Sequence, residues 1–264
     1  MLYENLKGVP DFKCDEFAPK KTKYCLIIPI INESPRIQKE LQRAKDSGIN
    51  HIIDIIICDG GSTDGCTDAE ELKELGVNSL LTKIGSGKQS AQLRMGFWWC
   101  LNRGYDGFVT IDGNNKDSIE DVPAFIGKLD DGYDFVQGSR FIKGGRAINT
   151  PLVRYVAVRL IHAPIITFTA KKKFTDTTNA YRAHSKKYIT HPSVQPFRDV
   201  FMTYELLAYL SVKASKLGLR TCEIPVSRTY PKNEKTPTKI KGFQGNKLLL
   251  KILLENARKK YDVL

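Results

Sequence analysis

Apolar runs alternate with mixed polar and apolar segments over the first 140 residues. The run 24–31 is apolar throughout, and the run 52–58 is rich in β-branched residues. Runs of this kind are typical of strands buried on both faces of a sheet. The segments 34–46, 67–75 and 88–102 mix polar and apolar residues as surface helices do. The alternation predicts crossover helices between parallel strands.

The same pattern continues further along the chain. Short apolar runs at 77–82, 107–111, 133–137 and 219–226 predict strands, and helices are expected at 119–129, 201–217 and 246–260. We therefore predict an α/β fold, with a mostly parallel sheet flanked by helices and a C-terminal helical extension.

A chain of 264 residues with 41% hydrophobic residues can form one large core. We expect a loose N-terminal arm at 1–22, an α/β domain at 23–230, and a basic C-terminal helix and tail at 231–264. The six cysteines show no CxxC spacing, which excludes a typical zinc motif and favours a reducing, cytoplasmic compartment.

The formal net charge of +12 predicts an anionic partner, such as a nucleic acid, anionic lipid headgroups or a phosphate-bearing substrate. The basic residues are scattered and show no stripe with interleaved aromatic residues, which argues against a nucleic acid. The apolar segment 151–170 contains two arginines and is not predicted to span a bilayer. It lies either at a membrane surface or in a core helix pair.

Polar residues follow three of the predicted strands. Asn32 and Glu33 follow the first, Asp59 begins the sequence Asp-Gly-Gly-Ser-Thr-Asp, and Asp112 begins Asp-Gly-Asn. In open α/β sheets, ligands bind outside the carboxyl ends of the strands. Three carboxylates there would repel one another unless a divalent cation, ribose hydroxyls or basic residues compensated them. Each motif taken alone is also compatible with an ordinary turn or helix start.

The order of these motifs resembles the family 2 glycosyltransferases of the GT-A fold, a Rossmann-like architecture. Within that family it is most similar to the dolichyl-phosphate mannose synthase and polyprenyl-phosphate glycosyltransferase branch. The resemblance spans about residues 24–240, and it is carried by Pro29-x-x-Asn-Glu, Asp59-Gly-Gly-Ser, Gly138-Ser-Arg-Phe-Ile-Lys-Gly-Gly, Asp176-Thr-Thr-Asn-Ala-Tyr-Arg-Ala, and Glu205-Leu-Leu followed by Gly218-Leu-Arg-Thr-Cys-Glu-Ile-Pro-Val.

The resemblance implies roles for individual residues. The nucleotide sugar, a UDP- or GDP-sugar, would be held by Pro29, Glu33, Asp59, Arg94, Asp112 and Asn114. Mg²⁺ or Mn²⁺ would bind Asp112 and Asn114, and Asp117 could contribute through water. Acceptor phosphate oxygens would meet Arg140, Arg154 and Arg182. The catalytic candidates are Asp112 and three possible general bases, Asp176, Asp199 and Glu205.

Three residues depart from the family pattern. Asn114 replaces the second aspartate of the usual Asp-x-Asp, Gly60 replaces the second aspartate of the common Asp-Asp-Gly-Ser, and Ala180 replaces a glycine. The expected reaction is inverting transfer of a sugar from a nucleoside-diphosphate sugar to a polyprenyl phosphate or to a glycan or lipid acceptor, in the cytoplasm or at the cytoplasmic face of a membrane. The alternatives are a sugar nucleotidyltransferase, or a catalytically degenerate GT-A protein that binds nucleotide or an anionic surface.

Overall fold

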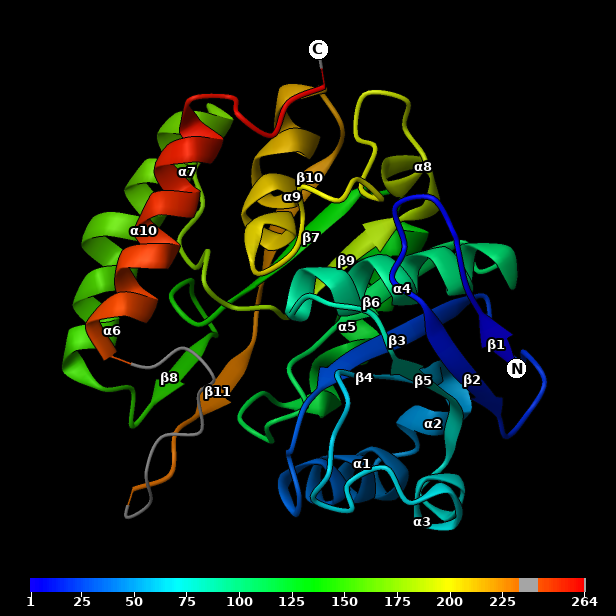
Figure 1. Ribbon diagram of the computed structural model, residues 1–264. Helices are drawn as coiled ribbons and strands as arrows, with labels where there is room; N and C mark the ends of the chain where they lie inside the picture. The colour runs from blue at the N-terminus through cyan, green and yellow to red at the C-terminus, as the bar shows by residue number, and fades with distance from the viewer. Residues whose placement is uncertain (233–241, 264) are drawn as a thin grey trace.

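A computed structural model describes residues 1–232 and 242–263. Its main sheet has nine strands in the order β1-β2-β5-β4-β3-β6-β9-β7-β10 (Figure 1). These strands are β1 (Leu2–Tyr3), β2 (Phe12–Glu16), β3 (Tyr24–Ile30), β4 (Asp54–Asp59), β5 (Val77–Lys83), β6 (Gly107–Thr110), β7 (Phe135–Ser139), β9 (Arg182–Ser185) and β10 (Thr221–Pro225). A small second sheet pairs β8 (Arg146–Ile148) with β11 (Ser227–Thr229) in parallel.

The central strands β5, β4, β3 and β6 run parallel, which confirms the α/β prediction. Strand β9 was not predicted, and it lies antiparallel between β6 and β7. Its sequence, Arg-Ala-His-Ser, has no apolar run. It becomes a strand because it pairs with β6 and β7, since in a sheet interior tertiary contacts outweigh the intrinsic strand propensity of the residues.

Helices cover both faces of the sheet. One face carries α1 (Arg36–Asp46), α2 (Ile49–Ile52), α3 (Ala69–Glu74) and α5 (Val122–Asp130), which follows a short 3₁₀ turn (Ile119–Asp121); the other carries α4 (Gln89–Asn102), α8 (Lys186–Ile189) and α9 (Glu205–Lys216). Strand β3 shows why both faces must be covered. Cys25 and Ile27 join the core beneath α4, whereas Leu26 and Ile28 join the core beneath α1.

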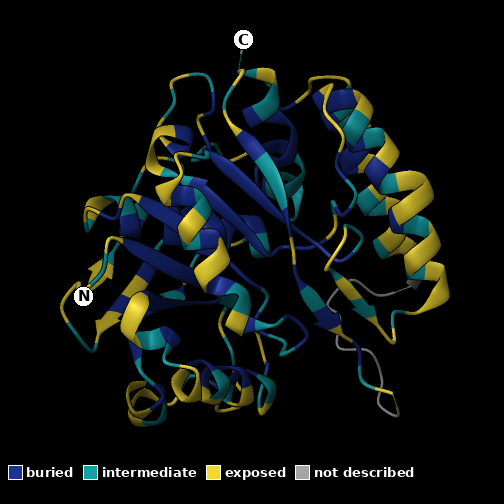
Figure 2. Ribbon diagram, turned by 180° about the vertical axis from the view of Figure 1, so that it is seen from behind, coloured by how far each residue is buried: buried dark blue, intermediate teal, exposed yellow. Residues whose placement is uncertain are grey.

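A further helical layer stands beside the sheet. It contains α6 (Leu152–Ala157), a π-helical turn (Val158–His162), α7 (Ala163–Ala170) and α10 (Gly242–Ala257), with α10 packed on α7 and α9. The helix Leu152–Ala170 is long and apolar enough to cross a membrane, by length and composition, and 22% of its apolar window is buried. Leu160 and Phe168 are 71% and 87% exposed on it, and Figure 2 shows exposed residues along the outer side of this layer.

The interpretation of residues 1–22 as a loose arm is wrong. Strand β2 pairs antiparallel with β5, and the ring of Tyr3 stacks on Phe12 at 4.7 Å between centroids. Phe12 and Cys14 alternate with polar residues and point into the core, which anchors the segment. The boundaries at 23 and 230 stay a prediction. Of the C-terminal segment 231–264, residues 233–241 and 264 lie outside the described residues.

Candidate active site

The predicted strand ends open into one cleft of about 1120 Å³. One half is polar and is lined by Pro29, Glu33, Gly60, Gln89, Asp112, Asn114, Lys116 and Arg228. The other half is formed largely by the helical layer, which contributes Val153, Arg154, Ile161, His162, Leu249, Leu250 and Leu253. The cleft therefore joins a charged compartment to an apolar one.

The polar half of the cleft is built by two loops, which are joined by hydrogen bonds between Asn32 and residues Ser62 and Thr63. Pro29 and Glu33 line the cleft directly, as predicted from the sequence. Asp59 does not; it is 1% exposed and accepts hydrogen bonds from the backbone N–H groups of Gly61 at 2.9 Å and Ser62 at 3.1 Å. The carboxylate thus shapes the Asp-Gly-Gly-Ser turn, and the neighbouring Gly60 lines the cleft in its place.

The Asp112 loop packs tightly against the end of β3. A Cβ at Gly113 would lie 2.5 Å from Cγ2 of Ile30, so only glycine fits there. The two Asp112 carboxylate oxygens accept hydrogen bonds from Nε2 of Gln89 at 3.0 Å and Nη2 of Arg228 at 3.1 Å. Burial raises the pKa of Asp112, but Arg228 and Lys116 outweigh it and hold that pKa below its usual value.

Three cations that line the cleft surround the ring of Tyr230. The ammonium of Lys116 lies 5.3 Å from the ring centroid, and the guanidinium carbons of Arg154 and Arg228 each lie 5.8 Å from it. Arg228 also forms an ion pair with the buried Asp117. Burial and the neighbouring Arg228 lower the pKa of Lys116 to about 7, and an anion in the cleft would favour its charged form.

Sequence reasoning missed Gln89, Lys116 and Arg228. Lys116 lies in the polar segment that begins with Asp112-Gly-Asn, and its position four residues after Asp112 is the signal that the sequence offers. Arg228 follows the Glu-Ile-Pro-Val segment by two residues, and the isolated bridge between Arg228 and Asp117 brings it beside Asp112.

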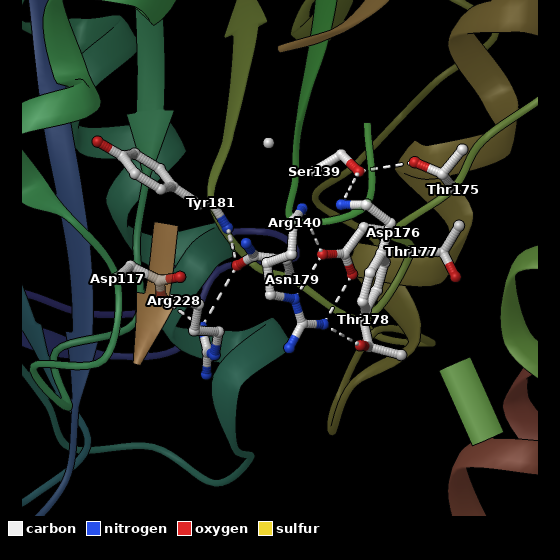
Figure 3. A network of polar contacts seen from close by, with 12 residues as sticks. Asp117, Ser139, Arg140, Thr175, Asp176, Thr177, Thr178, Asn179, Tyr181 and Arg228 are labelled. Atoms are coloured by element: carbon white, nitrogen blue, oxygen red, sulfur yellow. Dashed lines mark hydrogen bonds and ion pairs between the residues drawn. The ribbon is translucent and has the colours of Figure 1, made fainter. Parts of the chain in front are cut away.

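The prediction that Asp176 is a base and Arg140 a phosphate ligand is corrected. Figure 3 shows the two side chains facing each other. Nε and Nη2 of Arg140 donate to the Asp176 carboxylate at 2.6 and 2.8 Å, and the two side chains are 1% and 0% exposed. Neither is among the described residues that line the cleft. Because each charge neutralises the other away from solvent, the pair is structural.

Arg182 lines the cleft, but its guanidinium holds the backbone. It donates to the carbonyl oxygens of Asn179 at 3.0 Å, Leu207 at 2.6 Å and Thr177 at 3.0 Å. Burial lowers the pKa of Arg182 to about 10. The predicted role in phosphate binding is therefore corrected to one in shaping the cleft wall, whereas Arg154 lines the cleft and stays a phosphate-binding candidate.

Three further predicted residues serve other purposes. Arg94 is buried and donates to Asp199 at 2.8 Å, and both are absent from the described cleft lining. Glu205 accepts hydrogen bonds from the N–H and hydroxyl of Thr203 at 2.6 and 2.5 Å at the start of α9. Arg94 also donates to the carbonyl oxygen of Gly8 at 2.9 Å, so it ties both the N-terminal segment and the loop before α9 to α4. Glu205 holds the turn that leads into α9.

Asp112 and Asn114 fit a weakly held divalent cation. Both line the cleft with oxygen atoms, and Oδ1 of Asn114 is buried without a hydrogen-bond partner among the described residues. No group of three or more His, Cys, Asp or Glu residues suited to a metal occurs within 1–232 and 242–263. Mg²⁺ is often held by one or two carboxylates together with substrate phosphates, which would have to supply the remaining ligands here.

A match to the family described as Glycosyl transferase family 2 covers residues 25–194. The chain belongs to glycosyl transferase family 2. This family 2 enzyme is 27% identical over 221 residues to an undecaprenyl-phosphate mannosyltransferase of Micrococcus luteus, covering 82% of this chain and 86% of that protein. It is 25% identical to a polyprenol monophosphomannose synthase of Mycolicibacterium smegmatis, covering 90% and 88%. The branch predicted from the motifs is confirmed.

The architecture of this glycosyltransferase is also that of solved GT-A structures. Glucosyl-3-phosphoglycerate synthase from Mycobacterium tuberculosis, in complex with Mn²⁺, UDP and phosphoglyceric acid, superimposes with a TM-score of 0.63 at 17% identity, covering 89% of this chain and 78% of that one. The predicted GT-A fold is therefore confirmed.

Proposed function

We propose that this glycosyltransferase transfers a sugar from a UDP- or GDP-sugar to a polyprenyl phosphate, with inversion at the anomeric carbon. The main support is the two-part cleft, in which polar strand ends and clustered cations continue into an apolar wall. A nucleoside diphosphate suits the first part, and a prenyl chain suits the second. The curated relatives named for polyprenol and undecaprenyl phosphate add to this support.

The donor would lie across the strand ends. Glu33 and Pro29 would contact the nucleoside, and the diphosphate would lie beside Asp112, Lys116 and Arg228. Fixed positive charges there stabilise the negative charge that develops on the leaving nucleoside diphosphate. A divalent cation held by Asp112 and Asn114 would add further positive charge at the same place.

The acceptor would enter along the helical layer. Arg154 and His162 line the cleft beside the apolar Ile161 and Leu253, a combination that suits a phosphate attached to a hydrocarbon chain. A phosphate monoester has a second pKa of about 6, so its oxygen attacks the anomeric carbon without first losing a proton. This agrees with Asp176, Asp199 and Glu205 all being engaged in structural contacts.

A radiolabelled transfer assay tests this function. UDP- and GDP-sugars are incubated with the protein and a short polyprenyl phosphate, and label in the organic phase is measured. We expect a labelled glycosyl polyprenyl phosphate to form. The Arg154→Met variant should raise the KM for the acceptor by about tenfold, because one charge-assisted phosphate contact is lost. Release of free sugar without transfer would support a degenerate relative, and formation of a nucleotide sugar would support a nucleotidyltransferase.

We propose that the helical layer rests on the cytoplasmic face of a membrane. Its exposed apolar side chains include Leu160 and Phe168, and all six cysteines are free, which suits a reducing compartment. In vesicle flotation with anionic lipid, Leu160→Glu combined with Phe168→Glu should weaken binding at least about tenfold, since each buried apolar side chain contributes roughly 1.5–3 kcal/mol. Ile52→Glu, at a 44% exposed residue of α2, is the matched control. Equal flotation of all three proteins would contradict this placement.

A further inference from the structure

The polar half of the cleft is rich in cationic side chains and poor in metal ligands. Of the two residues predicted to bind a metal directly, Asp112 is the single carboxylate, and Arg228 and Gln89 each donate to one of its oxygens. Asn114 offers only a neutral oxygen. A divalent ion would therefore share Asp112 with a guanidinium and would lie in the field of Lys116, whose charge also acts on Asp112. Because both are positively charged, the ion and the guanidinium would compete for that one carboxylate.

The cations are held rigidly by the fold. Arg228 forms ion pairs with Asp112 at 3.1 Å and with Asp117, and it donates to Oδ1 of Asn179 at 3.3 Å. The backbone of Lys116 is fixed as well, because its carbonyl accepts from the N–H of Thr229 at 2.8 Å. The Asp112 loop and β11 are thus joined by both backbone and side chains. Preorganised charges of this kind stabilise an anion without reorganising when it binds.

We propose that Lys116 and Arg228 act as built-in counter-charges for the nucleoside diphosphate, so that nucleotide binding does not require a divalent metal. This is an inference that rests on the proposed function, since it assumes a nucleoside diphosphate in this cleft. Arg228 supplies a planar guanidinium suited to phosphate oxygens, and Lys116 supplies a compact point charge.

Calorimetric titration of UDP and GDP measures this directly, without any turnover. Each nucleotide is titrated into the wild-type protein in EDTA and again in Mn²⁺. We expect the better nucleotide to bind in EDTA with a Kd within about threefold of its value in Mn²⁺. Lys116→Gln should weaken binding in EDTA at least about tenfold, as expected for a lost charge-assisted contact. Lys73→Gln, at an exposed lysine of α3, removes the same charge elsewhere and should leave the Kd unchanged.

A double variant distinguishes charge from general damage. Asn114→Asp with Lys116→Gln adds a carboxylate and removes the ammonium, so its nucleotide binding should become Mn²⁺-dependent by at least about tenfold. Wild-type binding in Mn²⁺ but not in EDTA would overturn the inference and leave the proposed function standing. An absence of binding of either nucleotide in both conditions would overturn the proposed function and the inference with it. Unfolding curves for each variant confirm that it is folded.

Discussion

Replacing Asp112 by asparagine is expected to lower kcat for sugar transfer by about 10²–10³-fold, the range measured when one preorganised electrostatic contact is removed from an active site. The substitution keeps the shape of the side chain but removes the charge that holds Nη2 of Arg228 at 3.1 Å. Arg228 would then be oriented by Asp117 and Asn179 alone. Steady-state kinetics with the radiolabelled donor measure the effect.

Glu120→Gln is the matched control for this change, since Glu120 is a carboxylate paired with Arg43 on the surface and is absent from the described cleft lining. It should transfer sugar at the wild-type rate. Wild-type kinetics for Asp112→Asn would remove Asp112 from the catalytic site altogether, whether the diphosphate is held by a metal or by fixed cations.

Replacing Asp176 by alanine is expected to lower the free energy of unfolding by about 3–5 kcal/mol, because it leaves the Arg140 guanidinium charged and buried without its partner. For a chain of this size the melting temperature should fall by roughly 10 °C. Urea denaturation and calorimetry measure both quantities. At low temperature, the folded fraction should keep its kcat within a few-fold of wild type.

The alternative role for Asp176 makes the opposite prediction. A general base removed by mutation would cost about 10²–10⁴-fold in kcat, with little change in the unfolding curve. The double variant Asp176→Leu with Arg140→Met separates the two, since it removes both charges and should recover much of the lost stability. A double variant as unstable as Asp176→Ala would contradict the ion-pair explanation.

Most of the parallel sheet could be predicted from the sequence, because its strands are buried on both faces and must be apolar throughout. The runs 24–31 and 52–58 became β3 and β4 almost residue for residue. Strand β9 was not predicted because its residues are mostly polar, and its pairing with β6 and β7 depends on the rest of the fold. Strand β2 was not predicted because a short segment of alternating polar and apolar residues near a chain end resembles a loosely attached segment.

The site residues that directly follow a strand could be predicted from the sequence, whereas those brought in by tertiary packing could not. Glu33 and Asp112 line one cleft because the carboxyl ends of parallel strands meet at one edge. Arginines were assigned less well. A sequence does not show whether a guanidinium reaches a ligand, as Arg154 can, or is satisfied by carbonyl oxygens, as Arg182 is. Arg228 reaches Asp112 because β11 lies beside the loop that follows Asp112, where Arg228 and Asp117 form an isolated bridge.

The two N-terminal strands have a protective consequence. Strand β2 covers the outer edge of β5, whose residues Leu80 and Leu81 are buried on opposite faces of the sheet. A shortened chain that began at residue 23 would leave a row of unpaired N–H and C=O groups along that edge, next to apolar side chains. Such an edge is a template for pairing with another molecule. Strand β2 thus protects the enzyme from self-association through the edge of β5.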